Sequence, residues 1–503
     1  MGCGIVFDVG TTAVKTMVFN RHFVVEDSVS VEYRLLAPEK GWLEADSDCY
    51  WEAAKECMRS LRKQLGERLK QVDFVTVTTQ GETLIPICAA GRPLRNAIVW
   101  LDGRAEEESA FLKERVEKTH FYQVTGIPEC TPAVPVCKLM WIKRNEPELY
   151  RNTAWFLLVG DYMLYRLTGR VCTERTLMST TGYYDIRQSC LWQEMLDIAG
   201  IDRNKIPEIL ETGERAGEIC EETARELELP LHTAVFACAM DQVACAVGAG
   251  NVEDGVVTEN AGTCLILAMT AQKAALRPGG NLAFYQHALP GKYLAMTNCP
   301  TAGIILKWFK DEFCEREAAM AAEQGTSVYN TLGNLAAGIE PMSRGLILLP
   351  HFSGVLQPEC APGARGVFFG VTLETGKAQF VRCIMESVGF LLRENLEYLE
   401  AEQGIVVKEI RSLGGAAKSR TWEQIKADIV QRDMVHMKED ECTALGAAMI
   451  VSVTAGWYDK LEYACSVGNS EVERISFSYE NRVIYETGYE KYRNLYRLLK
   501  DEF

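Results

Sequence analysis

Long apolar runs and an excess of positive charge are both missing from this chain. No stretch approaches the roughly 18 consecutive apolar residues that cross a bilayer as a helix, and Asp8 interrupts the apolar start of the chain before it could act as a leader. Lysine and arginine total 53 against 69 aspartates and glutamates, and the net charge of -16 would repel a nucleic-acid backbone or an anionic membrane. We therefore expect a cytoplasmic protein with neither nucleic acid nor membrane as a partner.

Histidines are few, and the cysteines do not come in pairs. The six histidines are isolated and pair with no evident serine or cysteine nucleophile, so we assign none of them a catalytic role. The 18 cysteines are scattered, without a Cys-x-x-C pair and without a cysteine–histidine cluster at zinc spacing. We interpret them as reduced, mostly buried thiols that act as small apolar side chains.

Length and composition indicate two globular domains. With 503 residues, 48% of them hydrophobic and 24% charged, the chain is too long for one ordinary core and has no disordered character. A turn-rich break lies near the middle, over residues 250–255. We place the boundary there and expect an N-terminal lobe over residues 1–250 and a C-terminal lobe over residues 251–503.

A polar turn between two apolar runs opens the chain. Residues 5–9 and 13–19 are expected to be strands, and the turn between them is Gly10-Thr11-Thr12. Glycine lets the backbone approach a ligand closely, while backbone N–H groups and threonine hydroxyls can donate hydrogen bonds to phosphate oxygens. Asp8 precedes the turn and could hold a hydrated Mg²⁺, and Lys15 follows it. The hairpin therefore predicts a polyphosphate site.

A second hairpin of the same form begins the C-terminal half. Residues 256–268 place Gly262-Thr263 where the first hairpin has Gly10-Thr11, and Asn260 where it has Asp8. A repeated unit at the head of both halves favours two similar α/β lobes, of which only the first carries the metal-binding acid. Chance similarity between two apolar hairpins is the alternative.

Polar side chains also follow other predicted strands. Asp241 comes just after a strand at 234–238, where it could accept a proton from a substrate hydroxyl or cap the helix that follows, and the two roles are compatible. A second polar set lies at the ends of strands expected at 74–79 and 98–102: Gln80, Gly81, Glu82, Asp102 and Arg104. This set suits a polyhydroxyl ligand, with a solvated loop as the alternative.

A glycine turn near the C-terminus joins a strand at 410–413 to a helix. Gly414-Gly415-Ala416 would let a flat ring or a phosphate lie against bare backbone and a helix N-terminus, or would simply make a tight connection. The turn is not a P-loop, because Ala417 rather than glycine precedes Lys418. Elsewhere, apolar spacing predicts helices at 48–70, 104–118 and 377–402.

Together these stretches resemble the FGGY carbohydrate kinase family, which includes xylulokinase, glycerol kinase and gluconokinase. The motifs follow one another in the family's order, so the resemblance covers nearly the whole chain. Besides the segments above, it rests on Gly41-Trp42-Leu43-Glu44-Ala45-Asp46 with Trp51, on Arg92-Pro93 and Trp100-Leu101-Asp102-Gly103-Arg104, and on Asp161-Tyr162 with Leu167-Thr168-Gly169.

The resemblance implies an α/β fold and an activity. The family fold is two actin-like (ribonuclease H-like) ATPase lobes with a central cleft, and its members transfer a phosphoryl group from ATP, with Mg²⁺, to a sugar or polyol. The positions implied for ATP and its phosphates are Gly10, Thr11, Thr12, Lys15, Gly262, Thr263, Gly414, Gly415 and Ala416. Asp8 would hold Mg²⁺, Asp241 would accept the hydroxyl proton, and Gln242 would join Asp241 in the substrate set.

The sequence leaves open which sugar or polyol accepts the phosphoryl group. The loop Thr79-Gln80-Gly81-Glu82-Thr83 has neither the Met-His-Gly of xylulokinases nor the full Arg-Glu-Thr of glycerol kinases. A ketopentose such as xylulose is the first expectation, and a short polyol such as glycerol or a tetritol is the second. An actin- or Hsp70-like ATP-binding switch would also use twin hairpins, whereas Asp8 and Asp241 argue against a sugar sensor without catalysis. A homodimer is compatible with the family.

Overall fold

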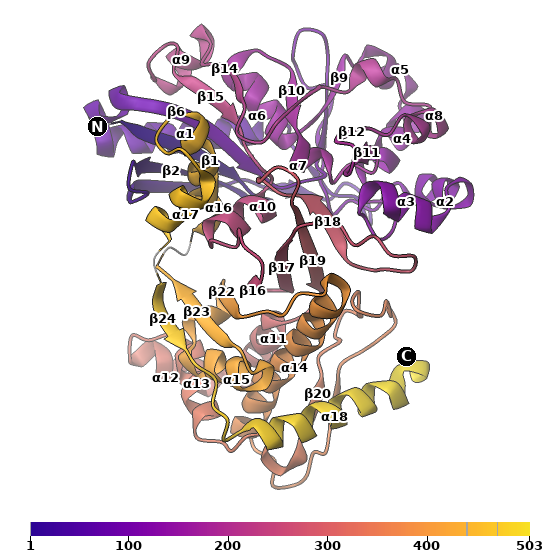
Figure 1. Cartoon of the computed structure of the whole chain (residues 1–503), viewed down its shortest axis with the longest axis vertical. Helices are drawn as coiled ribbons and strands as arrows, with labels where there is room; N and C mark the ends of the chain where they lie inside the picture. The colour runs from indigo at the N-terminus through magenta and orange to yellow at the C-terminus, as the bar shows by residue number, and fades with distance from the viewer. Residues whose placement is uncertain (1, 439–440, 470) are drawn as a thin grey trace. The chain divides into compact units, whose positions relative to one another are not determined.

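The computed structural model describes residues 2–438, 441–469 and 471–503, and the chain divides into two compact units (Figure 1). The first unit comprises Met1–Val252, Gln272–Leu294 and Glu441–Asn469, and the second comprises Glu253–Ala271, Ala295–Asp440 and Ser470–Phe503. The chain thus returns to the first unit twice. The assignment of separate roles to residues 1–250 and 251–503 stays a prediction. Within the described ranges, none of the helices has both the length and the apolar character needed to traverse a bilayer.

The main sheet of the first unit has the strand order β14-β15-β6-β1-β2-β3. Its strands are β1 (Cys3–Val9), β2 (Ala13–Asn20), β3 (Val25–Glu32), β6 (Val72–Thr79), β14 (Arg215–Glu218) and β15 (Ala234–Ala237). β1 is enclosed on both faces, which explains the apolar run that precedes Asp8. Because β1, β6 and β15 are parallel, their carboxyl ends lie at one edge of the sheet, near Asp8, Gln80 and Asp241.

A smaller sheet of the same unit has the order β4-β5-β8-β7-β9. Its strands are β4 (Leu35–Leu36), β5 (Glu44–Ala45), β7 (Leu84–Ile87), β8 (Ala97–Ile98) and β9 (Trp155–Leu158). The loop 80–83 connects β6 of the main sheet to β7 of the smaller one, so the predicted acceptor loop joins two sheets.

The other elements of the first unit surround these sheets. They are α1 (Cys49–Leu65), α2 (Glu106–Arg115), α3 (Lys118–Thr125), α4 (Pro135–Asn145), α5 (Pro147–Asn152), α6 (Val159–Thr168), β10 (Cys172–Glu174), α7 (Arg175–Met178), β11 (Tyr184–Asp185), β12 (Cys190–Leu191), α8 (Gln193–Ala199), β13 (Glu208–Leu210), α9 (Glu221–Leu227), α10 (Asp241–Gly248), β18 (Ala283–Gln286), α16 (Cys442–Thr454) and α17 (Leu461–Gly468). α1 buries Trp51, Ala54 and Cys57 against β2 and β3, so the apolar spacing correctly predicted a helix in this segment.

Helix α16, from the last returning segment, packs against α10, β1 and β6 (Figure 1). Glycines allow the two helices to approach closely. A Cβ added at Gly248 would lie 1.8 Å from the carbonyl oxygen of Cys442, and one at Gly446 would lie 1.8 Å from that of Ala244. Because α10 begins at Asp241, this crossing fixes the helix that carries the predicted base.

The second unit is built on a sheet with the order β19-β17-β16-β22-β23-β24. Its strands are β16 (Val256–Ala261), β17 (Leu265–Ala271), β19 (Tyr293–Cys299, which enters this unit at Ala295), β22 (Glu409–Leu413), β23 (Asp433–Met437) and β24 (Glu471–Ile475). Its other elements are α11 (Gly303–Phe313), α12 (Glu315–Glu323), α13 (Val328–Ala337), β20 (Ile347–Leu349), β21 (Val367–Phe369), α14 (Lys377–Gln403), α15 (Arg420–Val430) and α18 (Arg482–Leu499). β16 and β22 are parallel neighbours, so the turns that follow them share one edge of the sheet.

Two predicted elements differ from the structure. The strand predicted at 98–102 is wrong beyond Ile98, where β8 ends. The backbone turns instead, because the amide of Asp102 donates to the carbonyl of Val99 and its carboxylate accepts backbone N–H groups from Leu43 and Arg104. The helix predicted at 104–118 is shorter, ending at Arg115, whereas the long helix at 377–402 is confirmed as α14.

Candidate functional site

The turn of the first hairpin is tied to two neighbouring strand ends. The hydroxyl of Thr11 donates to Gln80 Oε1 (3.2 Å) and accepts from Trp100 Nε1 (3.0 Å). Thr12 is exposed, and nothing but its own turn lies near a Cβ built on Gly10. Thr11 therefore connects the predicted phosphate turn to the predicted acceptor loop, while no other segment covers the Cα of Gly10.

Carboxylates gather beside this turn. Burial raises the pKa of Asp8 to about 7, the charges of Asp241 and Glu441 raise it as well, and Lys15 opposes them. Lys15 Nζ lies 2.5 Å from Glu441 Oε1, so its charge is shared with another acid. Burial also raises the pKa of Asp241 to about 6, against hydrogen bonds from Gln242. Three acids and one lysine therefore contribute to the charge at this edge of the sheet.

Asp241 is held by a chain of buried hydrogen bonds. The backbone N–H of Gln242 donates to Asp241 Oδ1 at 2.6 Å. The N–H of Met240 donates to the hydroxyl of Thr176 (2.8 Å), which in turn donates to Glu174 Oε2 (2.6 Å). This chain fixes the backbone immediately before Asp241. The sequence indicated none of it, because Thr176 lies 64 residues from Met240.

The acceptor loop brings a second carboxylate towards the same region. Burial raises the pKa of Glu82 to about 7, Lys138 opposes the shift, and the charge of Asp241 adds to it. The pKa of Tyr285, on β18, is raised by burial and by the charges of Glu82 and Asp241. Glu82 and Asp241 are therefore brought together, and Tyr285, which no motif indicated, accompanies them. At Gly81 an added Cβ would meet a methyl group of Thr180 at 3.0 Å.

Asp102 and Arg104 are engaged with each other. Asp102 Oδ1 accepts from Arg104 Nε and Oδ2 accepts from Nη2, both at 2.8 Å. The guanidinium also pairs with Glu44 Oε1 (2.8 Å) and lies 4.0 Å from the centroid of the Trp42 ring. Both side chains are buried and hold the segment before β5 in place. Their predicted contact with a sugar stays a prediction.

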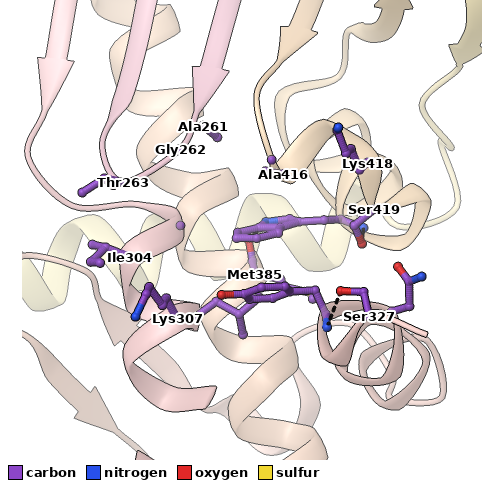
Figure 2. Close-up of a pocket in the computed structure, with 16 residues that line it drawn as sticks. Ala261, Gly262, Thr263, Ile304, Lys307, Ser327, Met385, Ala416, Lys418 and Ser419 are labelled. Atoms are coloured by element: carbon purple, nitrogen blue, oxygen red, sulfur yellow. Dashed lines mark hydrogen bonds between the residues drawn. The ribbon is translucent and has the colours of Figure 1, made fainter. Parts of the chain in front are cut away.

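The second unit contains a pocket of about 560 Å³ at the edge where β16 and β22 end. Figure 2 shows Gly262 and Thr263 on one side of it and Ala416, Lys418 and Ser419 on the other. Gly415 lines it as well, so four predicted nucleotide residues meet here, although Gly414 is not in the lining. Sequence reasoning missed several lining residues, which carry no motif of their own: Gly303, Lys307, Ser327, Tyr329, Asn330, Met385 and Trp422.

The second hairpin contacts the glycine turn directly. Gly414 has a φ of 79°, and a Cβ added there would lie 2.5 Å from Asn260 Oδ1. The hairpin closes with the pair Ala261 and Leu265, one residue tighter than Val9 and Val14 in the first hairpin. Asn260 thus packs against backbone where Asp8 faces other acids, which agrees with a metal-binding role for the first hairpin alone.

Comparison with known proteins places the chain in a family. Residues 3–248 match the N-terminal domain of the FGGY family of carbohydrate kinases, and residues 260–455 match its C-terminal domain. Xylulose kinase of Bacillus subtilis (strain 168) is 27% identical over 494 residues, 98% of this chain and 96% of the relative. Gluconokinase of the same organism is 26% identical over 498 residues, covering 99% and 96%.

Solved structures show the same fold. A ligand-bound xylulose kinase from Lactobacillus acidophilus superposes with a TM-score of 0.90 at 23% identity, covering 99% of this chain and 98% of that one. A glycerol kinase from Plasmodium falciparum with ADP gives 0.88 at 23% identity, covering 98% and 97%. The expected fold and the carbohydrate-kinase interpretation are therefore confirmed over the actin- or Hsp70-like switch. The chain belongs to the FGGY family of carbohydrate kinases, which transfer a phosphoryl group from ATP to a sugar.

Proposed function

We propose that this enzyme phosphorylates a hydroxyl of a neutral sugar or polyol, with a ketopentose such as xylulose first and glycerol or a tetritol second. The observation that carries the proposal is the placement of Asp241 at the carboxyl edge of the main sheet, where its charge reaches Asp8 of the phosphate hairpin and Glu82 of the acceptor loop. Several relatives are xylulose kinases, which supports the first acceptor, and Glu82 supports the second.

Asp241 is the proposed general base. Its Oδ1 is held by the N–H of Gln242, so Oδ2 takes the proton as the acceptor oxygen forms its bond to the γ-phosphorus. The bond between that phosphorus and the β–γ bridging oxygen breaks, and ADP leaves with the electron pair. A base with a pKa near 6 is ionised at neutral pH and accepts a proton more readily than an ordinary carboxylate.

The acids beside the first hairpin fit a Mg²⁺ ion. No group of three or more His, Cys, Asp or Glu side chains suited to a metal occurs in the described ranges. Mg²⁺ usually takes one or two carboxylates and completes its shell with water and phosphate oxygens, so Asp8, with the charge of Asp241 nearby, meets that requirement. When bound, the ion would neutralise phosphate charge during transfer.

The pocket of the second unit is the proposed nucleotide site. Its walls combine the bare backbone of Gly262 and Gly415 with the rings of Tyr329 and Trp422. Trp422 is fixed by a hydrogen bond from its indole N–H to the carbonyl of Met385 (3.1 Å). A purine can stack on such rings, and phosphates can accept from backbone N–H groups at a glycine turn.

The charges near Asp241 argue for an uncharged acceptor. Glu82 and Asp241 each carry a negative charge when ionised, and burial has already made both charges costly. An aldonate such as gluconate would add a third carboxylate to the same region. A neutral sugar offers only hydroxyl groups, which donate to carboxylates without repulsion.

The proposal is tested by measuring ADP formation with MgATP and a panel of xylulose, ribulose, glycerol, erythritol and gluconate. We expect one neutral acceptor to stimulate turnover at least 100-fold over the rate with water, and gluconate to stimulate it much less. Stimulation by gluconate alone would contradict the neutral-acceptor proposal. Stimulation by no sugar or polyol, in that panel and in a wider one, would contradict the kinase proposal.

A further inference from the structure

Lys138 is a buried charge that no motif predicted. It lies on α4, its side chain is 0% exposed, and its ammonium donates to the backbone carbonyls of Glu82 (3.0 Å) and Val99 (3.1 Å). One carbonyl belongs to the acceptor loop, and the other follows β8. Lys138 therefore joins the acceptor loop to the segment that carries Trp100, whose indole reaches the phosphate hairpin through Thr11.

The residue that Lys138 holds has an unusual backbone. Glu82 has a φ of 63°, a left-handed conformation that residues other than glycine, asparagine and aspartate rarely adopt. Such a conformation persists only where the surroundings enforce it. Here the amide of Thr83 donates to the carbonyl of Gly81 (2.8 Å), and Lys138 binds the carbonyl of Glu82 itself. These two contacts fix the backbone on both sides of the Glu82 side chain.

A neutral side chain could donate to both carbonyls, and burying it would cost less free energy than burying the charged ammonium of Lys138. Burial lowers the pKa of Lys138 to about 8, and the carboxylates of Glu82 and Asp102 resist that change. The same attraction opposes the rise in the pKa of Glu82. A buried ammonium is stable only with such partners, and a buried carboxylate likewise. The ammonium of Lys138 therefore interacts with the charge of Glu82 in addition to donating to the two backbone carbonyls.

We propose that Lys138 is a positioning residue for the acceptor: by donating to the backbone carbonyls of Glu82 and Val99 it holds Glu82 in its left-handed conformation, so that the Glu82 carboxylate can accept hydrogen bonds from the hydroxyl groups of a neutral sugar or polyol. The proposal rests on the proposed function, because it takes Glu82 as a contact of the acceptor. Lys138 itself acts through Glu82 and takes no part in the transfer of the phosphoryl group.

The first test compares Lys138→Met with Lys143→Met, the same change at an exposed position of the same helix. We expect Lys138→Met to raise the KM for the acceptor at least 10-fold and to change the KM for ATP less than 2-fold. Lys143→Met should change neither. An unchanged acceptor KM in a folded Lys138→Met protein would overturn the proposal.

A double-mutant cycle separates this role from general packing. Glu82→Gln removes the charge that Lys138 balances, so Lys138→Met should harm the Glu82→Gln protein less than it harms the wild type. We expect the acceptor KM of the double variant to be at least 5-fold below the product of the two single effects. Multiplicative effects would show that the two residues act independently. Should Lys138→Met fail to fold, Lys138→Gln, which keeps one donor without the charge, replaces it in the cycle.

Hydrogen exchange gives a readout that needs no acceptor. In the wild type the amide of Thr83 donates to Gly81, and the amide of Trp100 donates to the hydroxyl of Thr83 (3.1 Å). Both amides should exchange at least 10-fold faster in Lys138→Met and at the wild-type rate in Lys143→Met. Unchanged exchange would refute the positioning role even if no acceptor stimulated the enzyme, so the two proposals fail separately.

Discussion

At the scale of single residues, the buried carboxylate of Asp241 destabilises the fold when it is ionised and is also the proposed general base. Burial raises its pKa to about 6, above the value of a carboxyl group in an unfolded chain. A group shifted in this direction stabilises the folded protein fully below its unfolded pKa, and that contribution is lost as the pH rises through the folded pKa. Between about pH 4 and pH 6 the ionising carboxylate therefore begins to weaken the fold, and above that window it weakens the fold in full.

Asp241→Asn should separate the two effects. We expect kcat to fall by about 10²–10⁴-fold, since a general base is typically worth that much, while the KM for ATP stays unchanged. At pH 8 the variant should melt about 1–2 °C higher for each kcal/mol recovered, because the buried charge is gone while Asn Oδ1 can still accept from the N–H of Gln242. The gain should shrink towards pH 5, where wild-type Asp241 is largely protonated.

The measurements are steady-state kinetics and thermal unfolding across pH 5–8. Asp459→Asn, at an exposed position, is the control and should alter neither kcat nor the melting temperature. Near-normal turnover in Asp241→Asn would show that Asp241 is not the general base. A lower melting temperature of this variant at pH 8 would show that the ionised Asp241 carboxylate does not destabilise the fold.

Thr176 offers a second prediction at this scale. Thr176→Val keeps the shape of the side chain but leaves the N–H of Met240 without its acceptor and removes one donor from Glu174. An unsatisfied buried group costs about 1–3 kcal/mol, and the backbone before Asp241 loses its anchor. We expect kcat to fall on the order of 10-fold with an unchanged KM for ATP, and Thr176→Ser, which restores the hydroxyl, to recover most of it. Equal losses in the valine and serine variants would argue against the hydrogen bond.

The residues that the sequence predicted and those it missed differ in a physical way. Asp8, Asp241 and Gln80 follow apolar runs, and a polar group at the end of a buried strand can reach a ligand, so the local pattern was sufficient to predict that these three side chains lie at one edge of the sheet. Lys138 and Thr176 reach the site from other helices. Their roles exist only once distant segments pack together, and a lysine or threonine within a helix has no local feature that would reveal them.

At the scale of elements, the strands of the hairpins could be predicted from the sequence, whereas some of the turns could not. The apolar runs of both hairpins were predicted, because alternation and burial within a strand follow from the side chains alone. The strand predicted at 98–102 failed for the opposite reason. Its carboxylate at Asp102 captures backbone N–H groups from two segments, which stabilises a turn that apolar patterning does not register.

The glycine turn after β22 allows a matched pair of substitutions. Gly414 has a φ of 79° and lies against Asn260, whereas Gly415 has a φ of -67° and a Cβ added there meets nothing within 4 Å. Gly414→Ala should therefore lower the melting temperature by several degrees, through about 1–2 kcal/mol of backbone strain and the contact with Asn260. Gly415→Ala should leave the melting temperature unchanged.

The affinity for ATP then shows whether a glycine of this turn is needed for stability or for nucleotide binding. Gly415 lines the proposed ATP pocket, so a methyl group there should raise the Kd for ATP, measured by calorimetry, without any loss of stability. An unchanged Kd in Gly415→Ala would show that ATP does not lie against this backbone. An unchanged melting temperature in Gly414→Ala would show that the turn is not strained as its φ implies.

At the scale of the whole molecule, the chain is not two consecutive halves. Helix α16 lies at Cys442–Thr454, after most of the second unit in the sequence, yet it belongs to the first unit and buries most of its residues there. The sequence could not reveal this return. An apolar helix of small residues is equally suited to either unit, and its partners on α10 are 200 residues away along the chain.

This topology predicts how fragments behave. A fragment of residues 1–252 lacks α16, so the faces of α10, β1 and β6 that α16 covers would be exposed to water. We expect the fragment to bind a hydrophobic dye and to unfold without a sharp transition, since loss of fixed packing leaves a compact but fluctuating state. Adding a peptide of residues 441–469 should reduce dye binding and sharpen the transition. The matched control is that peptide with Gly446→Leu, whose side chain would enter the carbonyl of Ala244 and prevent close packing on α10. Cooperative unfolding of the fragment alone would mean that the first unit folds without its C-terminal segment. Equal rescue by both peptides would mean that close packing at Gly446 is not what stabilises the unit.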